Sequence, residues 1–126
     1  KMKLTNENYV GEAEKVIRNL LDKNRGRILT TSKIRNILSM ISDIYNDVRY
    51  LPGEELNAEI LGRIQYLKLH VVYEAGRERT VKDFIEEADL LSVIDSIGKS
   101  KEKFLLFCHY MEALVAYRKY LGKNDQ

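Results

Sequence analysis

The sequence contains few residues that interrupt helices and few that cross-link or anchor a chain. Pro52 is the one proline and Cys108 the one cysteine among 126 residues, and tryptophan is absent. A single cysteine cannot form an internal disulfide, and no basic leader followed by an apolar run opens the sequence, so we expect a reducing, cytoplasmic location. No apolar run approaches the roughly 20 residues of a membrane helix. This length predicts one domain with a core of its own.

The residue patterns of common catalytic and metal sites are also missing. His70 and His109 stand far apart, and neither belongs to a Glu-x-x-His or His-Glu-x-x-His pattern. No Gly-x-Ser-x-Gly turn and no glycine-rich phosphate loop occurs. Cys108 lies in the apolar run FLLFC with no cation beside it, which favours a structural thiol over a nucleophile. We therefore expect no enzymatic activity, no metal and no cofactor.

Apolar residues recur at helical spacing along almost the whole chain, and strand signals are nearly absent. The pattern predicts helices over about 7–23, 31–48, 54–76, 80–97 and 100–121. The predicted caps are Thr5 or Asn6, Thr30 or Thr31, Glu54 with Glu55, Thr80 with Asp83, and Ser100, and Gly76, Gly98 and Gly122 are the predicted stops. The last of these helices is apolar on most sides, which is typical of a central element. The predicted fold is all-α, a single five-helix bundle over 1–126 with disordered ends at about 1–5 and 122–126.

Charge is nearly balanced over the chain but not along it. Lys and Arg total 21 and Asp and Glu total 19, so a net charge of +2 gives little general attraction to nucleic acid. Any such binding has to come from local clusters of cations. The stretch from Lys23 to Arg35 has five cations and no acid, and its last two cations, Lys33 and Arg35, fall in the first turns of a helix, where free amides favour a phosphate.

A second basic pattern follows one stripe of the third predicted helix. Arg63, Tyr66, His70, Tyr73 and Arg77 alternate cations with rings at spacings of three and four. Such a stripe can hold a sugar-phosphate chain, and it is equally typical of a solvated helix flank with tyrosines at its edge. The candidate RNA-binding residues taken from these patterns are Lys33, Arg35, Arg63, Lys68, Arg77, Arg79 and Lys119.

The fourth predicted helix has the opposite charge. It carries acids against the single cation Lys82, namely Asp83, Glu86, Glu87, Asp89 and Asp95. This face is expected to repel nucleic acid and to suit a basic protein neighbour.

Four stretches, in order, resemble one family closely. LTNENYVGEAEKVI, LTTSKIRNILSMISDIYNDV, RIQYLKLHVVYEAGRERTVKDFIEEA and FCHYMEALVAYRKYLGK are similar to the small subunit of type III-A (Csm) CRISPR–Cas effector complexes. The resemblance covers nearly the whole chain. It implies a helical, non-catalytic subunit for antiviral defence, whose copies stack in a filament beside the backbone repeat subunits and the large polymerase subunit. It also implies contact with the phosphates of the duplex between guide RNA and target RNA, without sequence reading.

Three classes of function remain, and the resemblance favours the first of them. The first is a structural subunit that contacts RNA, the second is a helical adaptor that binds only protein, and the third is an autonomous enzyme, for which the sequence offers no set of catalytic residues.

Overall fold

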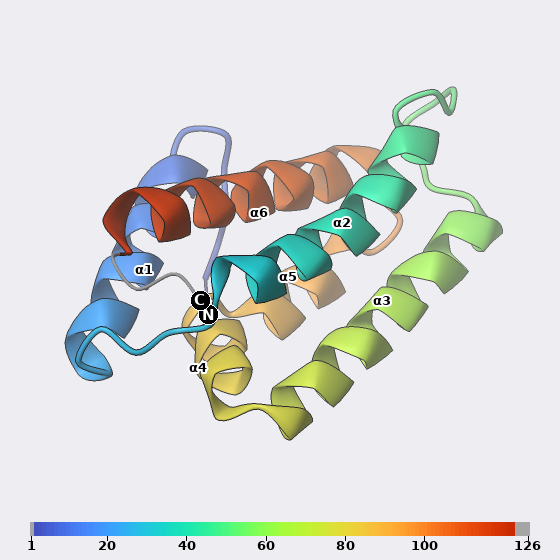
Figure 1. Ribbon diagram of the computed structural model, residues 1–126. Helices are drawn as coiled ribbons and strands as arrows, with labels where there is room; N and C mark the ends of the chain where they lie inside the picture. The colour runs from blue at the N-terminus through green and yellow to red at the C-terminus, as the bar shows by residue number, and fades with distance from the viewer. Residues whose placement is uncertain (1, 123–126) are drawn as a thin grey trace.

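The computed structural model describes residues 2–122, which form a bundle of six helices with no extended strand (Figure 1). The helices are α1 (Tyr9–Lys23), α2 (Thr31–Val48), α3 (Ala58–Arg77), α4 (Arg79–Glu87), α5 (Leu90–Ile97) and α6 (Lys101–Leu121). The all-α class is therefore confirmed, whereas the prediction of five helices was wrong by one.

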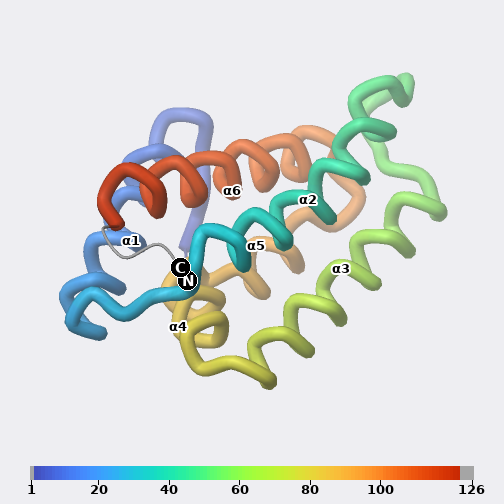
Figure 2. The backbone as a smooth tube through the Cα atoms, viewed as in Figure 1, coloured from blue at the N-terminus to red at the C-terminus, as the bar shows by residue number. Residues whose placement is uncertain are grey.

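Helix α6 is the central element of this bundle, as its apolar character predicted. It packs against α1, α2 and α5 (Figure 2). Phe104, Phe107, Tyr110, Met111 and Leu114 are almost completely buried and recur at spacings of three and four, so they lie on one broad side of the helix. Full burial of a large apolar side chain contributes about 1.5 to 3 kcal/mol. This buried side of α6 packs against the three neighbouring helices.

The predicted fourth helix is two helices, because the chain breaks at Ala88 and Asp89. Asp89 is left-handed, with φ of 56°. The carbonyl of Ala88 accepts a hydrogen bond of 2.9 Å from the buried Tyr110 hydroxyl instead of serving a continuous helix. A buried tyrosine hydroxyl requires a partner, and no local pattern in the sequence shows that Tyr110 finds it here. The contact between distant segments therefore decides the break between α4 and α5.

Two helix starts lie where the sequence placed them. The Thr30 side chain accepts the Lys33 amide at 3.2 Å, and the Ser100 side chain accepts the Lys103 amide at 3.1 Å. Near the N-terminus, Thr5 and Asn8 exchange hydrogen bonds between backbone and side chain, and α1 begins at Tyr9 rather than Glu7. Met2 belongs to the stretch that was expected to be disordered. Its backbone amide donates to the Asp89 carboxylate. Residues 1 and 123–126 of the expected disordered ends lie outside the described residues.

The other helix starts and one stop differ from the sequence prediction. Helix α3 begins at Ala58, where the Asn57 side chain accepts the Ile60 amide at 2.9 Å, and not at Glu54 and Glu55. The 54–56 segment is instead extended and hydrogen-bonded to residues 99–101. Gly76 does not stop α3, which continues to Arg77. Thr80 lies inside α4, so the predicted Thr80 cap was wrong, and Asp83 pairs with Arg79 instead.

Candidate nucleic-acid interface

A hollow of about 410 Å³ lies between α2 and α3, and two of the predicted RNA-binding cations meet there. It is lined by Lys33, Asn36, Ile37, Ser39, Met40, Asp43, His70, Glu74, Arg77 and Val81. Lys33 comes from the first turn of α2 and Arg77 from the last turn of α3. They meet because the two helices run side by side in opposite directions (Figure 1).

Both cations of the hollow are already engaged with carboxylates. Lys33 Nζ lies 2.7 Å from Glu78 Oε1, and Arg77 Nη1 lies 3.4 Å from Glu74 Oε2. The Arg77 guanidinium also lies 5.6 Å from the centre of the Tyr73 ring. Ion pairs at such exposed positions contribute only about 0 to 1 kcal/mol. A phosphate can therefore replace these carboxylates at small cost.

A second hollow, of about 400 Å³, continues the same face toward the start of α3. It shares Met40 and Asp43 with the first, and Arg63 borders it. Arg63 donates to the Asp47 carboxylate at 2.6 Å and to the Asp43 carbonyl at 3.2 Å. Lys33, Arg63 and Arg77 thus belong to one continuous face, which we call the α2–α3 face.

The remaining candidate cations are spread over other parts of the surface. Lys68 pairs with Asp95 of α5 at 2.6 Å, on the flank of α3 away from α2, and Arg79 pairs with Asp83 within α4 at 3.0 Å. Arg35 is exposed two residues after Lys33, which on a helix is nearly the opposite side. Lys119 is exposed in the last turn of α6. The structure therefore does not gather the predicted residues into a single patch.

The predicted stripe on α3 divides between two directions. His70 lines the first hollow, whereas Tyr66 and Tyr73 point outward from α3 and are 71% and 60% exposed. The Tyr66 and His70 rings remain neighbours, with centres 6.4 Å apart. The cations and His70 line the two hollows, as does the exposed Tyr66, whereas Tyr73 lines neither of them.

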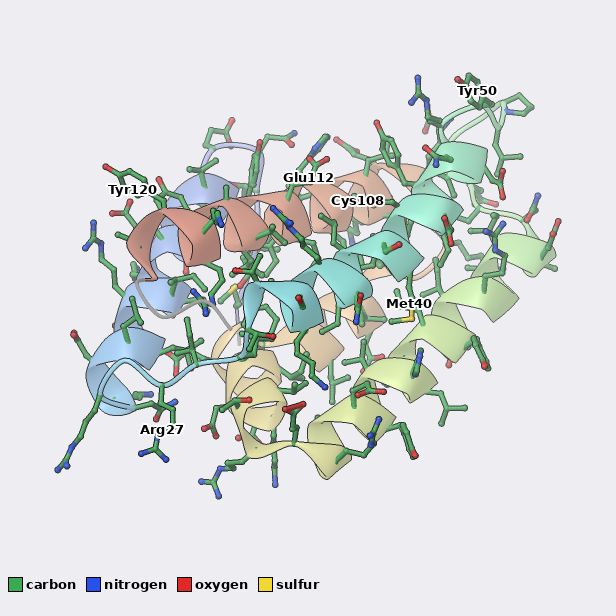
Figure 3. All side chains as sticks on the ribbon, viewed as in Figure 1. Arg27, Met40, Tyr50, Cys108, Glu112 and Tyr120 are labelled. Carbon is green, nitrogen blue, oxygen red and sulfur yellow. The ribbon has the colours of Figure 1, made fainter. Side chains whose placement is uncertain are left out.

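The sequence stretch without acids also contributes cations that the predicted set left out. Arg25 and Arg27 lie in the connection between α1 and α2 and are exposed, and within residues 2–122 neither contacts a carboxylate. Gly26 between them has φ of 82°. Figure 3 shows Arg27 pointing away from the bundle. The absence of acids between Lys23 and Arg35 was the signal that could have singled them out.

Most acidic side chains of the predicted fourth helix form ion pairs with cations of this same chain. Glu87 accepts from Lys23 at 2.8 Å, and this bond raises the pKa of the Lys23 ammonium. Asp83 pairs with Arg79, and Asp95 with Lys68. Glu86 is left exposed on α4. Because these pairs neutralise part of the negative charge, this region presents less negative charge to a neighbouring molecule than its sequence suggested.

The thiol of Cys108 is suited to packing and not to nucleophilic attack. Burial, with a smaller contribution from the Glu112 carboxylate, raises its pKa from 9.0 to about 12. A thiol with so high a pKa is almost wholly protonated at neutral pH. Among residues 2–122, no three His, Cys, Asp or Glu side chains come together in a way that could hold a metal ion. No helix in that range has the length and apolar composition that crossing a bilayer requires.

Comparisons with known proteins show the family of this chain. The model of the family described as Csm2 Type III-A matches residues 3–124. A protein of Streptococcus thermophilus named CRISPR system Cms protein Csm2 is 45% identical over 123 residues, covering 97% of this chain and 98% of the relative. A protein of the same name from Mycobacterium tuberculosis is 39% identical over 125 residues, which cover 99% of this chain and 100% of the relative. Another protein of this name, from Enterococcus italicus, is 39% identical over 99 residues, which cover 77% of this chain and 71% of the relative. With a match over nearly its full length, the chain belongs to the Csm2 family of type III-A CRISPR systems.

Proposed function

We propose that this protein is a non-catalytic structural subunit of a cytoplasmic Csm effector complex, and that it contacts the phosphates of the duplex between guide RNA and target RNA. Its copies stack beside the backbone repeat subunits and the large polymerase subunit, as the family resemblance implies. Base pairing between guide and target supplies the sequence specificity of antiviral defence, so this subunit need not read bases.

The observation that carries the proposal is the convergence of Lys33 and Arg77 on one hollow, with Arg63 farther along the same face. Lys33 belongs to the first turn of α2, where the helix dipole and free amides favour an anion. Its side chain is 38% exposed, and within residues 2–122 its ammonium pairs with the Glu78 carboxylate alone. A phosphate at this position would gain the cation and the helix end together.

The same geometry explains why contact should not depend on sequence. Lys33, Arg63 and Arg77 all extend from the flanks of the two helices α2 and α3. An RNA double helix has a deep, narrow major groove that side chains cannot read, whereas its phosphates are accessible. Contacts of this kind fix position and leave sequence to base pairing.

The test is the salt dependence of target-RNA binding by the assembled complex. We expect Lys33→Ala, Arg63→Ala and Arg77→Ala combined to weaken binding of all target sequences alike and to lower the salt slope by about 2, since each phosphate contact contributes roughly 0.7 to 0.9. The matched control is Lys15→Ala, Arg18→Ala and Lys23→Ala, which also removes three ion-paired cations but from α1. The control should retain the wild-type slope.

Equal slopes for the two triple variants, both fully assembled, would remove the phosphate assignment. The second candidate, a helical adaptor that binds only protein, would then lead. The observation in its favour is that Glu74, Glu78 and Asp47 already neutralise the cations of the α2–α3 face. Binding of RNA and adaptor function make opposite predictions for this assay, so it separates them.

A further inference from the structure

The α2–α3 face carries a second set of polar side chains, which lie between its cations and which a phosphate contact does not use. Asn36 and Ser39 of α2 and His70 of α3 line the first hollow. Asp43 of α2 lines both hollows. Within residues 2–122, none of these four side chains has a hydrogen-bond or ion-pair partner. Three of them are exposed and His70 is half-buried, so all four are open to a ligand.

The packing of the two helices places these groups in the middle of the face. Arg63 pairs with Asp47 at one end, and Lys33 and Arg77 share the hollow at the other end, because α2 and α3 are antiparallel (Figure 1). From position 33 to position 47 the α2 axis advances about 21 Å, at 1.5 Å per residue. The polar residues of α2 fall inside this interval, at steps of three and four.

We propose that these middle residues bind the 2′-hydroxyl groups of RNA ribose, with the Asp43 carboxylate as the principal acceptor. We call them the hydroxyl strip: Asn36, Ser39, Asp43 and His70. The inference rests on the proposed phosphate contact and adds the chemical group that is bound between the phosphates. A carboxylate only accepts hydrogen bonds and repels a phosphate, whereas a hydroxyl can donate to it.

Arg63 and Asp43 bring the two kinds of binding group side by side. Arg63 Nη2 donates to the Asp43 backbone carbonyl at 3.2 Å, so a phosphate-contacting guanidinium lies next to a hydroxyl acceptor. Phosphate and 2′-hydroxyl are neighbours in every nucleotide of RNA. The wide, shallow minor groove of an A-form helix displays these hydroxyls to a protein surface. Cations at both ends of the face, with hydroxyl acceptors between them, match that arrangement.

The consequence of this arrangement is a preference for RNA over DNA. The cations alone attract the phosphates of either nucleic acid. DNA has no 2′-hydroxyl, so a DNA strand on this face would leave the Asp43 carboxylate near phosphates without a hydrogen-bond donor. The hydroxyl strip therefore adds chemical selectivity to a contact that does not depend on sequence.

The test compares binding of two targets by the assembled complex, namely target RNA and the same RNA with 2′-fluoro groups in place of its 2′-hydroxyls. Fluorine preserves the sugar conformation of the A-form helix but cannot donate a hydrogen bond. Its effect on base pairing is the same for every protein variant. The ratio of the two dissociation constants, fluoro over hydroxyl, therefore reports the protein contact when variants are compared.

We expect Asp43→Ala to lower this ratio roughly 2- to 10-fold, the net contribution of one hydrogen bond. Asp43→Asn retains a carbonyl acceptor and should keep most of the wild-type ratio. The matched control is Asp22→Ala on α1, which also removes an exposed carboxylate that has no ion pair within residues 2–122. This control should keep the wild-type ratio.

A second arm places the 2′-fluoro groups in the guide RNA instead of the target. A lower ratio for Asp43→Ala in one arm identifies the strand that the hydroxyl strip contacts. If the Asp43 carboxylate acts through its charge alone, Asp43→Ala changes both dissociation constants alike. An unchanged ratio in both arms, or an equal loss for Asp22→Ala, would overturn the hydroxyl assignment. The reduced salt slope of the Lys33, Arg63 and Arg77 variant would still stand, so this failure is distinct from failure of the phosphate proposal.

Discussion

Arg118 is the most deeply buried charged side chain in residues 2–122, with 1% of its surface exposed. Its Nε donates to the Leu29 carbonyl at 2.7 Å, which ties the end of α6 to the connection between α1 and α2. That connection carries the exposed Arg25 and Arg27. Burial of a guanidinium is costly without good partners, and this bond to the Leu29 carbonyl makes Arg118 a structural residue. Its neighbour Lys119, in contrast, is exposed and was predicted to bind RNA.

Gly122 lies against Arg118 so closely that a side chain there has no room. A Cβ on Gly122 would overlap Arg118 Nη1 and would lie 2.7 Å from the Arg118 carbonyl. We expect Gly122→Ala to lower the free energy of unfolding by about 1 to 3 kcal/mol, the usual cost of overpacking. Urea denaturation followed by circular dichroism measures this.

The control for that change is Gly11→Ala in α1, where a Cβ meets nothing within 4 Å. Alanine favours the helix by up to about 1 kcal/mol over glycine, so this variant should be slightly more stable than the wild type. If both variants behaved alike, the close packing of Gly122 on Arg118 would be unsupported.

At the scale of the element, the helix ends distinguish local pattern from tertiary contact. Thr30, Asn57 and Ser100 each accept a backbone amide three residues later. Thr80 was predicted as a cap on equally good local grounds, but it lies within α4 and caps nothing. The sequence between Glu78 and Asp83 permits either start, and in the structure Glu78 both ends α3 and precedes the first residue of α4.

Alanine substitutions at two of these residues should therefore differ in effect. Asn57→Ala is expected to cost about 1 kcal/mol of unfolding free energy, because it removes the acceptor of the Ile60 amide. Thr80→Ala should cost less than about 0.5 kcal/mol, because alanine is the better helix former inside a helix. Thermal and urea unfolding of both variants measure the difference. A larger loss for Thr80→Ala would restore the sequence-based cap.

At the scale of the whole molecule, α6 makes stability depend on pH in the alkaline range. Burial raises the pKa of the Cys108 thiol to about 12 and that of the Tyr110 hydroxyl well above its ordinary value. The unfolded chain loses these protons at lower pH than the folded protein. Unfolded molecules then bind fewer protons, so the free energy of unfolding falls as pH rises.

We expect the Cys108 contribution to be fully present below pH 9.0 and to disappear progressively toward pH 12, following its pKa values in the unfolded and folded states. Cys108→Ala should flatten the decline over this range relative to wild type and leave the Tyr110 part. Urea unfolding in a pH series checks this. Identical declines for the two proteins would mean that Cys108 ionises as easily folded as unfolded.

The sequence by itself determined the helical class, the central place of α6 and the cap at Ser100, and it narrowed the cap of α2 to Thr30 or Thr31. Those features rest on apolar periodicity and on hydrogen bonds within a few residues. The pairs formed by Glu74 with Arg77 and by Arg79 with Asp83 also join residues three and four apart, although the sequence analysis did not predict them. Local spacing was sufficient wherever the interacting groups belong to the same turn or the same helix.

Only the tertiary structure decided the break at Asp89, the burial of Arg118 and the distribution of the cations. Lys33, Arg63 and Lys68 meet Glu78, Asp47 and Asp95, which come from other elements. Which flank of a helix faces a neighbour depends on how the helices pack, and a charge count along the chain does not contain that information. Periodicity specifies the buried side of each helix, whereas the partner of each surface charge depends on which helices lie beside it.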